Sequence, residues 1–292
     1  MSKAATYIVV SPVRNEEKHL PLTISSMVAQ TIRPVQWIIV NDGSTDQTGR
    51  IAEEAARTYS WIKVVNRSDR GYRKAGGGVI DTFYEGFVLM EGGSWEYVVK
   101  LDGDLSFDAN YFEECFEHFD KNGRLGIAGG TICNLVNGSV EVESKIDPKF
   151  HVRGATKIYR RDCWQEIGGL IHAPGWDTLD EVKANMLGWN TCTFSDINVI
   201  HHRPAGAAYG AWNDRVKGGM GCYIAGYHPL FMLIKSIKRM AQKPYFIGGC
   251  GFMFGFVKGY VSRVPQIDDK ALIRYFRQQQ MNRLFFRKSL WS

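Results

Sequence analysis

The sequence lacks any pair of cysteines with Cys-x-x-Cys spacing, although it contains six cysteines. Neither a zinc ribbon nor a thioredoxin-like redox site is therefore expected. It also lacks an uninterrupted apolar run of about 20 residues, the length that a transmembrane helix needs. The first apolar run, at 7–11, is too short for the core of a signal peptide. These absences argue against export and favour a cytoplasmic protein with reduced cysteines.

The loop after this first apolar run lacks the glycines of a phosphate-binding loop. The segment VVSPVRNEE at 9–17 matches neither the dinucleotide-binding fingerprint nor the P-loop. It argues against a nucleotidyltransferase that makes sugar nucleotides, because such an enzyme needs a Gly-rich triphosphate loop at this place. The sequence has no internal repeat and no low-complexity segment, so we expect a globular chain with a large core.

Excess positive charge is absent from most of the chain and is concentrated at its end. Residues 203–292 carry 15 Lys and Arg against three acids, whereas residues 1–202 carry 21 against 27. The basic part contains apolar and aromatic runs at 228–240 and 244–261, which lysines and arginines interrupt. This pattern is typical of helices that lie on an anionic lipid surface. Nucleic acid is not expected as a partner, because these basic residues form no recognisable binding module.

Short β-branched and aromatic runs alternate with helical patterns through the first third of the chain. Strands are expected at 7–11, 36–41, 61–65 and 96–101, and helices at 21–30, 45–59 and 79–90. Beyond them we expect helices at 110–120 and 177–187, strands at 125–134 and 191–194, and a polar loop or hairpin at 137–147. The alternation predicts an α/β fold with a mostly parallel, doubly wound sheet whose ligands bind beyond the carboxyl ends of the strands.

Two carboxylates follow the fourth expected strand directly, in Asp102-Gly103-Asp104. Carboxylates separated by one small residue can share a hard cation, and oxygen ligands suit Mg²⁺ or Mn²⁺. Such a cation would neutralise charge on a departing diphosphate. His202, at the end of a strand-like run, could add an imidazole to this metal site. A solvated Asp-Gly turn and a purely structural histidine are the alternatives.

Two further loops have residues suited to a nucleotide. Asp42, in VNDGSTD at 40–46, follows the second expected strand and could accept hydrogen bonds from a nucleobase, although a plain turn with a helix cap is the alternative. Arg73 and Lys74 precede three glycines at an expected helix start, where backbone amides favour anions. Flexibility alone is the other explanation for these glycines.

Taken in order, these stretches resemble the family 2 glycosyltransferases of the GT-A fold, over roughly residues 6–205. The resemblance rests on VVSPVRNEE, NDGSTD, the Asp102-Gly103-Asp104 turn, and GATKIYRR followed by GGL. GWDTLDE, HHRP and GYHPLF also resemble a bacterial and archaeal subgroup associated with surface polysaccharide assembly. The resemblance implies a GT-A catalytic domain at 1–205, with a nucleotide-binding half at 1–104 and an acceptor-side half at 105–205. A helical, basic, membrane-associating extension at 206–292 would follow.

The resemblance also implies roles for individual residues. In many members a Glu-Asp pair precedes a Gly-aromatic pair, and the same spacing from Gly188-Trp189 reaches Trp176-Asp177, where tryptophan replaces the glutamate. Asp177 is therefore the expected catalytic base and Asp180 the second candidate, although both acids could simply cap a helix. The donor would be bound by Pro12, Arg14, Glu16, Asp42, Arg73, Lys74, Asp102, Gly103 and Asp104.

The activity implied is transfer of a sugar from a nucleotide-diphosphate sugar to a hydroxyl, with inversion at the anomeric carbon. UDP is expected in preference to GDP, and the acceptor would be a glycan or a lipid-linked glycan at the inner face of the cell membrane. The cofactor would be Mn²⁺ or Mg²⁺, with Asp102, Asp104 and His202 as ligands. The alternatives are a sugar-nucleotide nucleotidyltransferase and a non-catalytic, membrane-bound scaffold.

Overall fold

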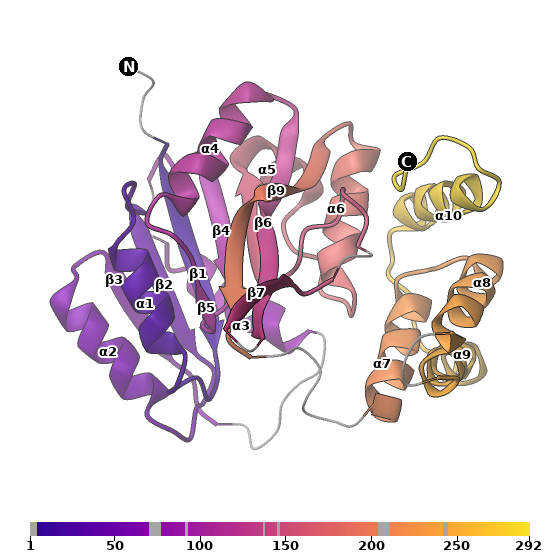
Figure 1. Ribbon diagram of the computed structural model, residues 1–292, viewed down its shortest axis with the longest axis horizontal. Coiled ribbons are helices and arrows are strands. Elements are labelled where there is room, and N and C mark those ends of the chain that lie inside the picture. The colour runs from indigo at the N-terminus through magenta and orange to yellow at the C-terminus, as the bar shows by residue number, and fades with distance from the viewer. Residues whose placement is uncertain are drawn as a thin grey trace.

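The structure is a computed structural model, and it describes residues 5–69, 77–90, 93–136, 138–144, 147–203, 211–241 and 245–292. A mixed sheet with helices on both faces forms one side of the molecule, and a layer of helices from the end of the chain forms the other (Figure 1). The strand order through the described sheet is β3-β2-β1-β4-β8-β6-β9-β5, with β7 paired to β6.

The first part of the chain forms the parallel half of the sheet. Strands β3, β2, β1 and β4 pair in parallel in that order, and helices α1, α2 and α3 connect them. The expected alternation and the α/β fold class are therefore confirmed. The elements are β1 (Tyr7–Val13), α1 (Leu20–Val28), β2 (Gln36–Asn41), α2 (Thr48–Thr58), β3 (Ile62–Asn66), α3 (Gly78–Phe87) and β4 (Tyr97–Leu101).

Helices on both faces explain why these strands are almost uniformly apolar. Successive residues of a strand point to opposite faces, so Val9 and Ile39 join one buried cluster whereas Ile8 and Ile38 join another. The first cluster includes side chains of α1 and the second includes Phe83 of α3. A strand buried on both faces reads as a continuous hydrophobic run, as β2 and β4 do.

The second part of the chain forms the mixed half of the sheet. Strand β8 pairs antiparallel with β4 and β6, whereas β6 and β9 are parallel. The expected strand at 191–194 and the run that ends at the histidines form one strand, β9, whose register against β6 shifts at two places. The elements are β5 (Leu105–Ser106), α4 (Tyr111–Lys121), β6 (Leu125–Val136), β7 (Ser139–Val142), β8 (Thr156–Arg160), α5 (Arg161–Ile167), α6 (Trp176–Met186) and β9 (Asn190–His201).

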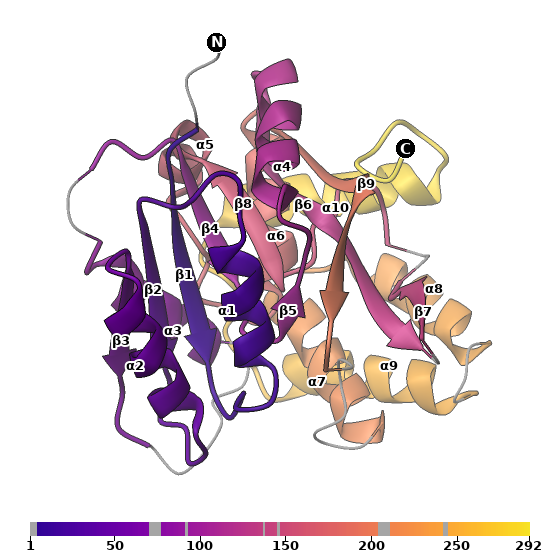
Figure 2. The ribbon, with the colours of Figure 1, turned by 60° about the vertical axis from the view of Figure 1, so that its left-hand side comes forward.

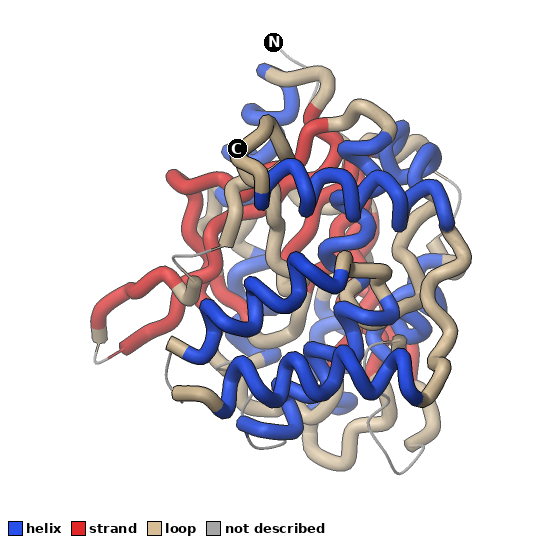
Figure 3. Tube along the Cα trace, turned by 90° about the vertical axis from the view of Figure 1, so that its right-hand side faces the viewer, coloured by secondary structure: helices blue, strands red, loops and turns tan. Residues whose placement is uncertain are grey.

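The end of the chain forms a layer of helices with its own apolar cluster. This cluster includes Leu179 and Val182 of α6, so the layer packs against the α/β part through that helix. Figure 3 shows the layer as blue helices in front of the strands. The described strands end at His201 and the described helices resume at 211, on either side of the predicted boundary after residue 205. The boundary itself stays a prediction. The helices are α7 (Ala211–Ile224), α8 (Pro229–Met240), α9 (Ile247–Val261) and α10 (Lys270–Leu284).

Glycines let α7 and α9 approach until their backbones touch. A Cβ added to Gly219 would lie 1.9 Å from the carbonyl oxygen of Phe252, and one added to Gly255 would lie 2.0 Å from that of Val216. No other residue fits at these contacts, which explains the glycine-rich sequence of α9. Among the helices that the structure describes, none combines the length and the apolar character needed to cross a bilayer.

Candidate active site

Strands β1, β2 and β4 lie side by side and parallel (Figure 2), so their carboxyl ends bring the loops of Asp42 and Asp102 to one edge of the sheet. The backbone amide of Asp42 donates to the carbonyl oxygen of Val13, which fixes the loop after β2 against the end of β1. Gly103 lies against the same valine, since a Cβ there would be 2.5 Å from Val13 Cγ1. The glycine of the Asp-Gly-Asp turn is therefore needed for space, because this turn packs on β1.

Asp102 is held by a buried lysine of β4. The Lys100 ammonium contacts Asp102 Oδ1 and donates to the carbonyl oxygen of Gly154 at 2.5 Å. Burial of the site raises the pKa of Asp102, and the nearby lysine charge opposes that shift. Asp102 keeps about a third of its side chain exposed. This carboxylate is therefore oriented by the protein and still open to a ligand.

Asp104 is buried, and positive side chains contact only one of its oxygens. Oδ2 lies 3.3 Å from both His201 Nε2 and Arg203 Nε, whereas Oδ1 has no hydrogen-bond partner among the described residues. Although burial works to raise it, the hydrogen bond from His201 and the two positive charges lower the pKa of Asp104. Asp104 is therefore an ionised carboxylate with one oxygen left for a cation.

The histidine beside Asp104 is His201 rather than the predicted His202. Burial lowers the pKa of His201, but its interactions with the Asp104 and Glu143 carboxylates outweigh burial and raise that pKa to about 9. His202 Nε2 instead lies 2.8 Å from the hydroxyl of Ser106, and its ring stacks on His19. The contact of His202 with Asp104 is through the main chain: the His202 backbone amide donates to the Asp104 carbonyl oxygen at 2.9 Å. The geometry thus favours His201 over His202 at the acidic turn.

Glu16 and Arg203 connect the loop after β1 with the end of β9. The Arg203 guanidinium contacts Glu16 Oε1 as well as Asp104, and Glu16 is 4% exposed. In this structure Glu16 therefore orients Arg203. Pro12 is partly exposed on β1, paired in register with Val40, at the same sheet edge.

The loop after β2, the other part of the predicted donor site, contains Asp42, which two arginines contact. Arg67 NH1 lies 2.7 Å from Asp42 Oδ1, and Arg14 NH1 donates to the Asp42 carbonyl oxygen at 2.6 Å. Arg67 also contacts Glu85 of α3 at 2.6 Å, so it anchors this loop to a helix. The carboxylate is thus fixed at the sheet edge. Arg73 and Lys74 lie outside the residues that the structure describes.

The two candidates for the catalytic base differ in exposure. Asp177, in the first turn of α6, is partly exposed. Asp180 is fully buried, where it accepts from Lys157 at 2.9 and 3.0 Å and from the hydroxyl of Tyr159 at 2.6 Å. Burial raises the pKa of Asp180 to about 6. A carboxylate enclosed in this way has no path to an acceptor hydroxyl, so the geometry favours Asp177.

A buried ionic network lies beneath these acids. Lys157 is fully buried and contacts Glu181 at 2.7 Å, and Glu181 in turn accepts from His151 and from the backbone amide of Val152. Such a network orders the residues around it when every member has a partner. It fixes α6 against β8 and the segment that precedes β8.

Trp176 occupies the position where the resemblance implied a glutamate. Its ring lies 5.6 Å from the Lys100 ammonium and 5.5 Å from that of Lys157, distances at which cations are attracted to an aromatic face. The tryptophan ring therefore lies near both the lysine of the acidic turn and the lysine of the buried network, which are partners in register between β4 and β8. Gly154 packs on the same ring, because a Cβ there would lie 3.1 Å from Trp176 Cζ2.

These features match a known family. The sequence model described as Glycosyl transferase family 2 matches residues 8–172, which is more than half of the chain. The chain belongs to glycosyl transferase family 2. The matched region contains the loops of Asp42 and of the Asp-Gly-Asp turn, and it ends just before α6.

Curated members of this glycosyltransferase family are similar to parts of the chain. The uncharacterized glycosyltransferase EpsJ of Bacillus subtilis is 27% identical over 142 residues, which are 49% of this chain and 37% of that protein. The poly-beta-1,6-N-acetyl-D-glucosamine synthase of Staphylococcus epidermidis is 31% identical over 255 residues, 77% of this chain and 56% of the synthase. The chain thus spans about half or less of the length of these relatives.

Solved structures agree in fold. The crystal structure of S. aureus TarS 1-349 has a TM-score of 0.53 at 17% identity, covering 95% of this chain and 78% of that one. The mannosyltransferase PcManGT from Pyrobaculum calidifontis, in complex with GDP-Man and Mn²⁺, has a TM-score of 0.57 at 14% identity, covering 98% and 89%. The expected GT-A fold of a family 2 glycosyltransferase is confirmed.

The acidic turn fits a divalent cation that substrate helps to hold. Within the described ranges, no three His, Cys, Asp or Glu side chains gather as a closed metal cage. Mg²⁺ is commonly bound by one or two carboxylates together with substrate phosphates, which needs no such cage. The buried Oδ1 of Asp104 and the half-open carboxylate of Asp102 supply oxygens of this kind.

Several residues of the site are absent from the sequence-based prediction. Lys100 reads as part of an apolar strand, and Arg203 and His201 reach the acidic turn only because β9 runs beside β5. A lysine inside a buried strand, two residues before an acid, is a signal that points to Lys100. No local pattern connects Arg203 with Glu16, which lie 187 positions apart.

Proposed function

We propose that this family 2 glycosyltransferase moves a sugar from a nucleotide-diphosphate sugar to a hydroxyl of a glycan acceptor. The observation that supports this most directly is the pair of carboxylates after β4, one of them buried with an unpartnered oxygen, beside Asp42 at one sheet edge. The ligands of solved neighbours also support a nucleotide-sugar donor. One solved neighbour is in complex with UDP, another with UDP-GlcNAc and a third with GDP-Man and Mn²⁺.

In this proposal the acidic turn and the Asp42 loop bind different parts of the donor. Asp102 and Asp104 would hold Mn²⁺ or Mg²⁺, which when bound supplies positive charge for the leaving diphosphate. Asp42, with Arg67 and Arg14 around it, would contact the nucleoside, and UDP is preferred over GDP. Since Lys100 and Arg203 already contact the acidic turn, the protein orients both carboxylates before any substrate arrives.

Asp177 is the proposed base for an inverting, single-displacement reaction. It would remove the proton from the acceptor hydroxyl as that oxygen attacks the anomeric carbon. The residues just before it touch the helical layer: a Cβ on Gly175 would lie 3.9 Å from Ala225 Cβ, and one on Gly221 would lie 3.5 Å from Pro174 Cβ. An acceptor that reaches Asp177 therefore passes close to α7.

We further propose that the helical layer docks on the inner face of the cell membrane and that the acceptor is lipid-linked. Helices α8 and α9 expose apolar side chains at helical spacing, among them Leu233 and Ile237 on α8 and Val257 and Val261 on α9. Exposed lysines, Lys238 and Lys258, accompany them. Anionic lipid attracts each such basic residue by about 1 kcal/mol. Membrane contact and charge would then act together at one surface.

The donor proposal is tested by measuring nucleotide binding and turnover. Thermal unfolding of the wild-type chain is followed with UDP, GDP and their sugars, with and without Mn²⁺, because a ligand of the native state raises the unfolding temperature. We expect a rise that needs Mn²⁺, loss of that rise in Asp104→Asn, and loss of transfer by about a hundredfold or more.

A matched variant controls for the loss of one carboxylate. Asp108 is exposed in the loop that follows β5, and Asp108→Asn removes a carboxylate close in sequence to the acidic turn. This variant is expected to bind the nucleotide as the wild type does. Unchanged Mn²⁺-dependent binding and turnover in Asp104→Asn would contradict the proposed role of this carboxylate, whereas absence of nucleotide binding and turnover in the wild type would favour the scaffold alternative.

A further inference from the structure

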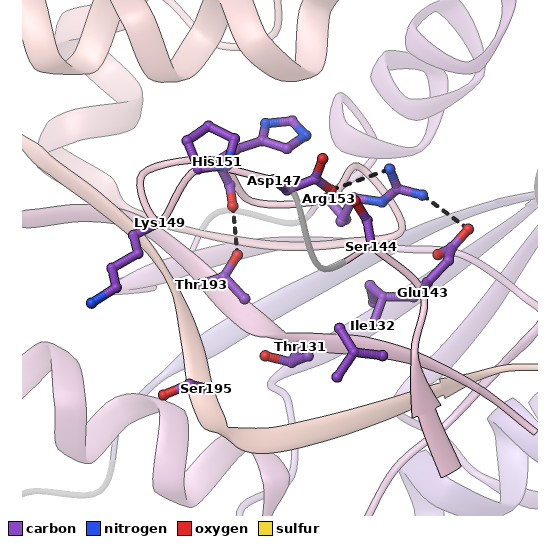
Figure 4. A pocket seen from close by; sticks show the side chains of 12 residues that line it. Thr131, Ile132, Glu143, Ser144, Asp147, Lys149, His151, Arg153, Thr193 and Ser195 are labelled. Atoms are coloured by element: carbon purple, nitrogen blue, oxygen red, sulfur yellow. Dashed lines mark hydrogen bonds and ion pairs between the residues drawn. The ribbon is translucent and has the colours of Figure 1, made fainter. Parts of the chain in front are cut away.

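A pocket whose lining mixes charged, hydroxyl-bearing and apolar side chains lies on the acceptor side of the acidic turn, between the β6–β7 hairpin, β9 and the segment at 147–153 (Figure 4). Its walls include Glu143, Asp147, Lys149 and Arg153, and its floor and mouth include Thr193 and Ser195. None of these residues belongs to the predicted donor site. The pocket is therefore a second hollow close to the reaction centre.

Charges along one wall are paired with each other. Arg153 NH2 lies 2.9 Å from Glu143 Oε1, and Arg153 NH1 lies 3.5 Å from Asp147 Oδ2. In Figure 4 these three side chains form a row, and Lys149 lies apart from them. Two acids are thus matched by two bases. The wall presents hydrogen-bond donors and acceptors without a large net charge.

Contacts join this pocket to the proposed reaction centre at two places. Glu143 Oε2 lies 3.7 Å from His201 Nδ1, and the same histidine contacts Asp104 through its other nitrogen. Arg153 is followed by Gly154, whose carbonyl oxygen accepts from Lys100 and at which an added Cβ would lie 3.4 Å from Asp177 Cβ. The pocket wall is therefore connected to the acidic turn through His201 and to the proposed base through the main chain at 153–154.

Hydrogen-bonding capacity is left over at this corner. Asn134 Oδ1 is buried and has no hydrogen-bond partner in the part of the chain that the structure describes, and His201 Nδ1 has only the 3.7 Å contact to Glu143. The two residues are paired in register between β6 and β9. Buried polar atoms without partners are rare in native proteins, and a ligand or water commonly satisfies them.

We propose that this pocket binds a neutral, hydroxylated sugar ring of the acceptor. Paired charges and the hydroxyls of Thr193 and Ser195 suit sugar hydroxyls, while Ile132 and Val142 in the lining suit the apolar C–H face of a ring. A phosphate or uronate fits less well, because Arg153 already pairs with Glu143 and Asp147 and the wall offers no large excess of positive charge to an anion. This inference rests on the proposed glycosyltransferase function, whose acceptor it defines.

The test uses the whole chain and simple glycosides as probes. Methyl β-glucoside, methyl N-acetyl-β-glucosaminide, methyl glucuronide and inorganic phosphate are titrated by ligand-observed NMR, with UDP plus Mn²⁺ measured in parallel. We expect a neutral glycoside to bind. Ser195 is exposed at the pocket mouth, so Ser195→Trp should fill the pocket without disturbing the core and weaken glycoside binding about tenfold or more.

Matched variants show whether the pocket itself is responsible. Ser139 is exposed on β7 outside the lining, so Ser139→Trp should bind glycosides as the wild type does. Lys149→Ala should weaken binding, whereas Lys121→Ala, at an exposed lysine of α4, should not. The inference is overturned if Ser195→Trp binds the neutral glycosides unchanged, if phosphate or glucuronide binds instead, or if no glycoside binds while UDP with Mn²⁺ does. Absence of nucleotide binding would contradict only the donor proposal.

Discussion

The ammonium of Lys157 donates to the backbone carbonyl oxygen of Asp177 at 2.5 Å. The same ammonium is neutralised by Asp180 and Glu181, all three side chains being fully buried. The buried network therefore holds the first turn of α6, and with it the proposed base, through the main chain. This relationship separates a residue that would act on substrate from residues that position it.

Substitution of Asp177 and of Asp180 should affect different properties, the first catalysis and the second stability. Asp177→Asn is expected to lower kcat by about a hundredfold or more, because a general base typically contributes that much, while the unfolding temperature and nucleotide binding stay close to wild type. Asp180→Asn should instead lower stability, since it weakens the partner of a buried ammonium. Steady-state kinetics and thermal unfolding of both variants check this. A normal kcat in Asp177→Asn would contradict its proposed role.

Removal of the central cation should be costly. Lys157→Met leaves Asp180 and Glu181 buried without their charge partner, and breaking a buried pair commonly costs about 3–5 kcal/mol. Protonation of Asp180, whose pKa is already raised, would absorb part of this cost. Urea unfolding measures the change, with Lys121→Met on the surface of α4 as the control. Equal stability of the two variants would mean that the network contributes little.

The contribution of His151 to stability should depend on pH. Burial lowers the pKa of His151, but the charge of Glu181 and its hydrogen bond raise it more, so the folded state holds this proton more tightly than the unfolded chain. The stabilisation is thus fully present below the unfolded pKa of about 6.5 and is lost as pH rises through the folded pKa. Asp177 and Lys157 also influence this histidine.

The measurement compares the free energy of unfolding of the wild type and of His151→Gln across this pH range. The difference between them should shrink as pH rises above about 6.5. Asp180, with a pKa raised to about 6, adds a fall in stability in both proteins as pH rises toward that value, so only the difference reports His151. A difference that grows with pH would contradict the assigned direction.

The sequence predicted those features of the fold and the site that are determined by residues close together in the chain. The alternation of β1 to β4 and the acidic turn after β4 can be read locally, because a buried strand and the residues that leave it are adjacent in sequence. The choice between Asp177 and Asp180 could not be read in that way. Both lie on the first turns of α6, and only the packing of Lys157 from β8 decides which is buried.

Contacts between segments that are distant in the sequence were not predicted, because only the folded structure brings those segments together. The sequence indicated His202 for the metal site, and local pattern does not separate it from its neighbour, since adjacent residues of a strand differ only in the face to which they point. The pairing of β9 with β5 directs the His201 ring to Asp104. Trp176 stands where the family resemblance implies a glutamate, and the sequence did not indicate what this tryptophan does. In the structure its ring lies 5.6 and 5.5 Å from the ammonium groups of two buried lysines.

Membrane docking predicts that acidic substitutions on the exposed faces of α8 and α9 reduce binding to anionic vesicles. Ile237 is 55% exposed and Val257 is 48% exposed, so glutamate at either position should not disturb the core. Each change removes an apolar contact worth about 1.5–3 kcal/mol if fully buried in lipid, and it adds a repelled charge. The double variant Ile237→Glu and Val257→Glu should therefore partition onto vesicles at least about tenfold more weakly in a pelleting assay.

The matched control places the same change on another surface. Leu22 of α1 is 41% exposed in the α/β part of the chain, and Leu22→Glu should leave vesicle binding unchanged. Wild-type pelleting should also fall as salt rises, because exposed charges are screened within about 8 Å at physiological ionic strength. Binding that is insensitive to salt and to the double variant would show that α8 and α9 do not form the docking surface. The lipid-linked acceptor would then lose its structural support, whereas the donor site after β4 would be unaffected.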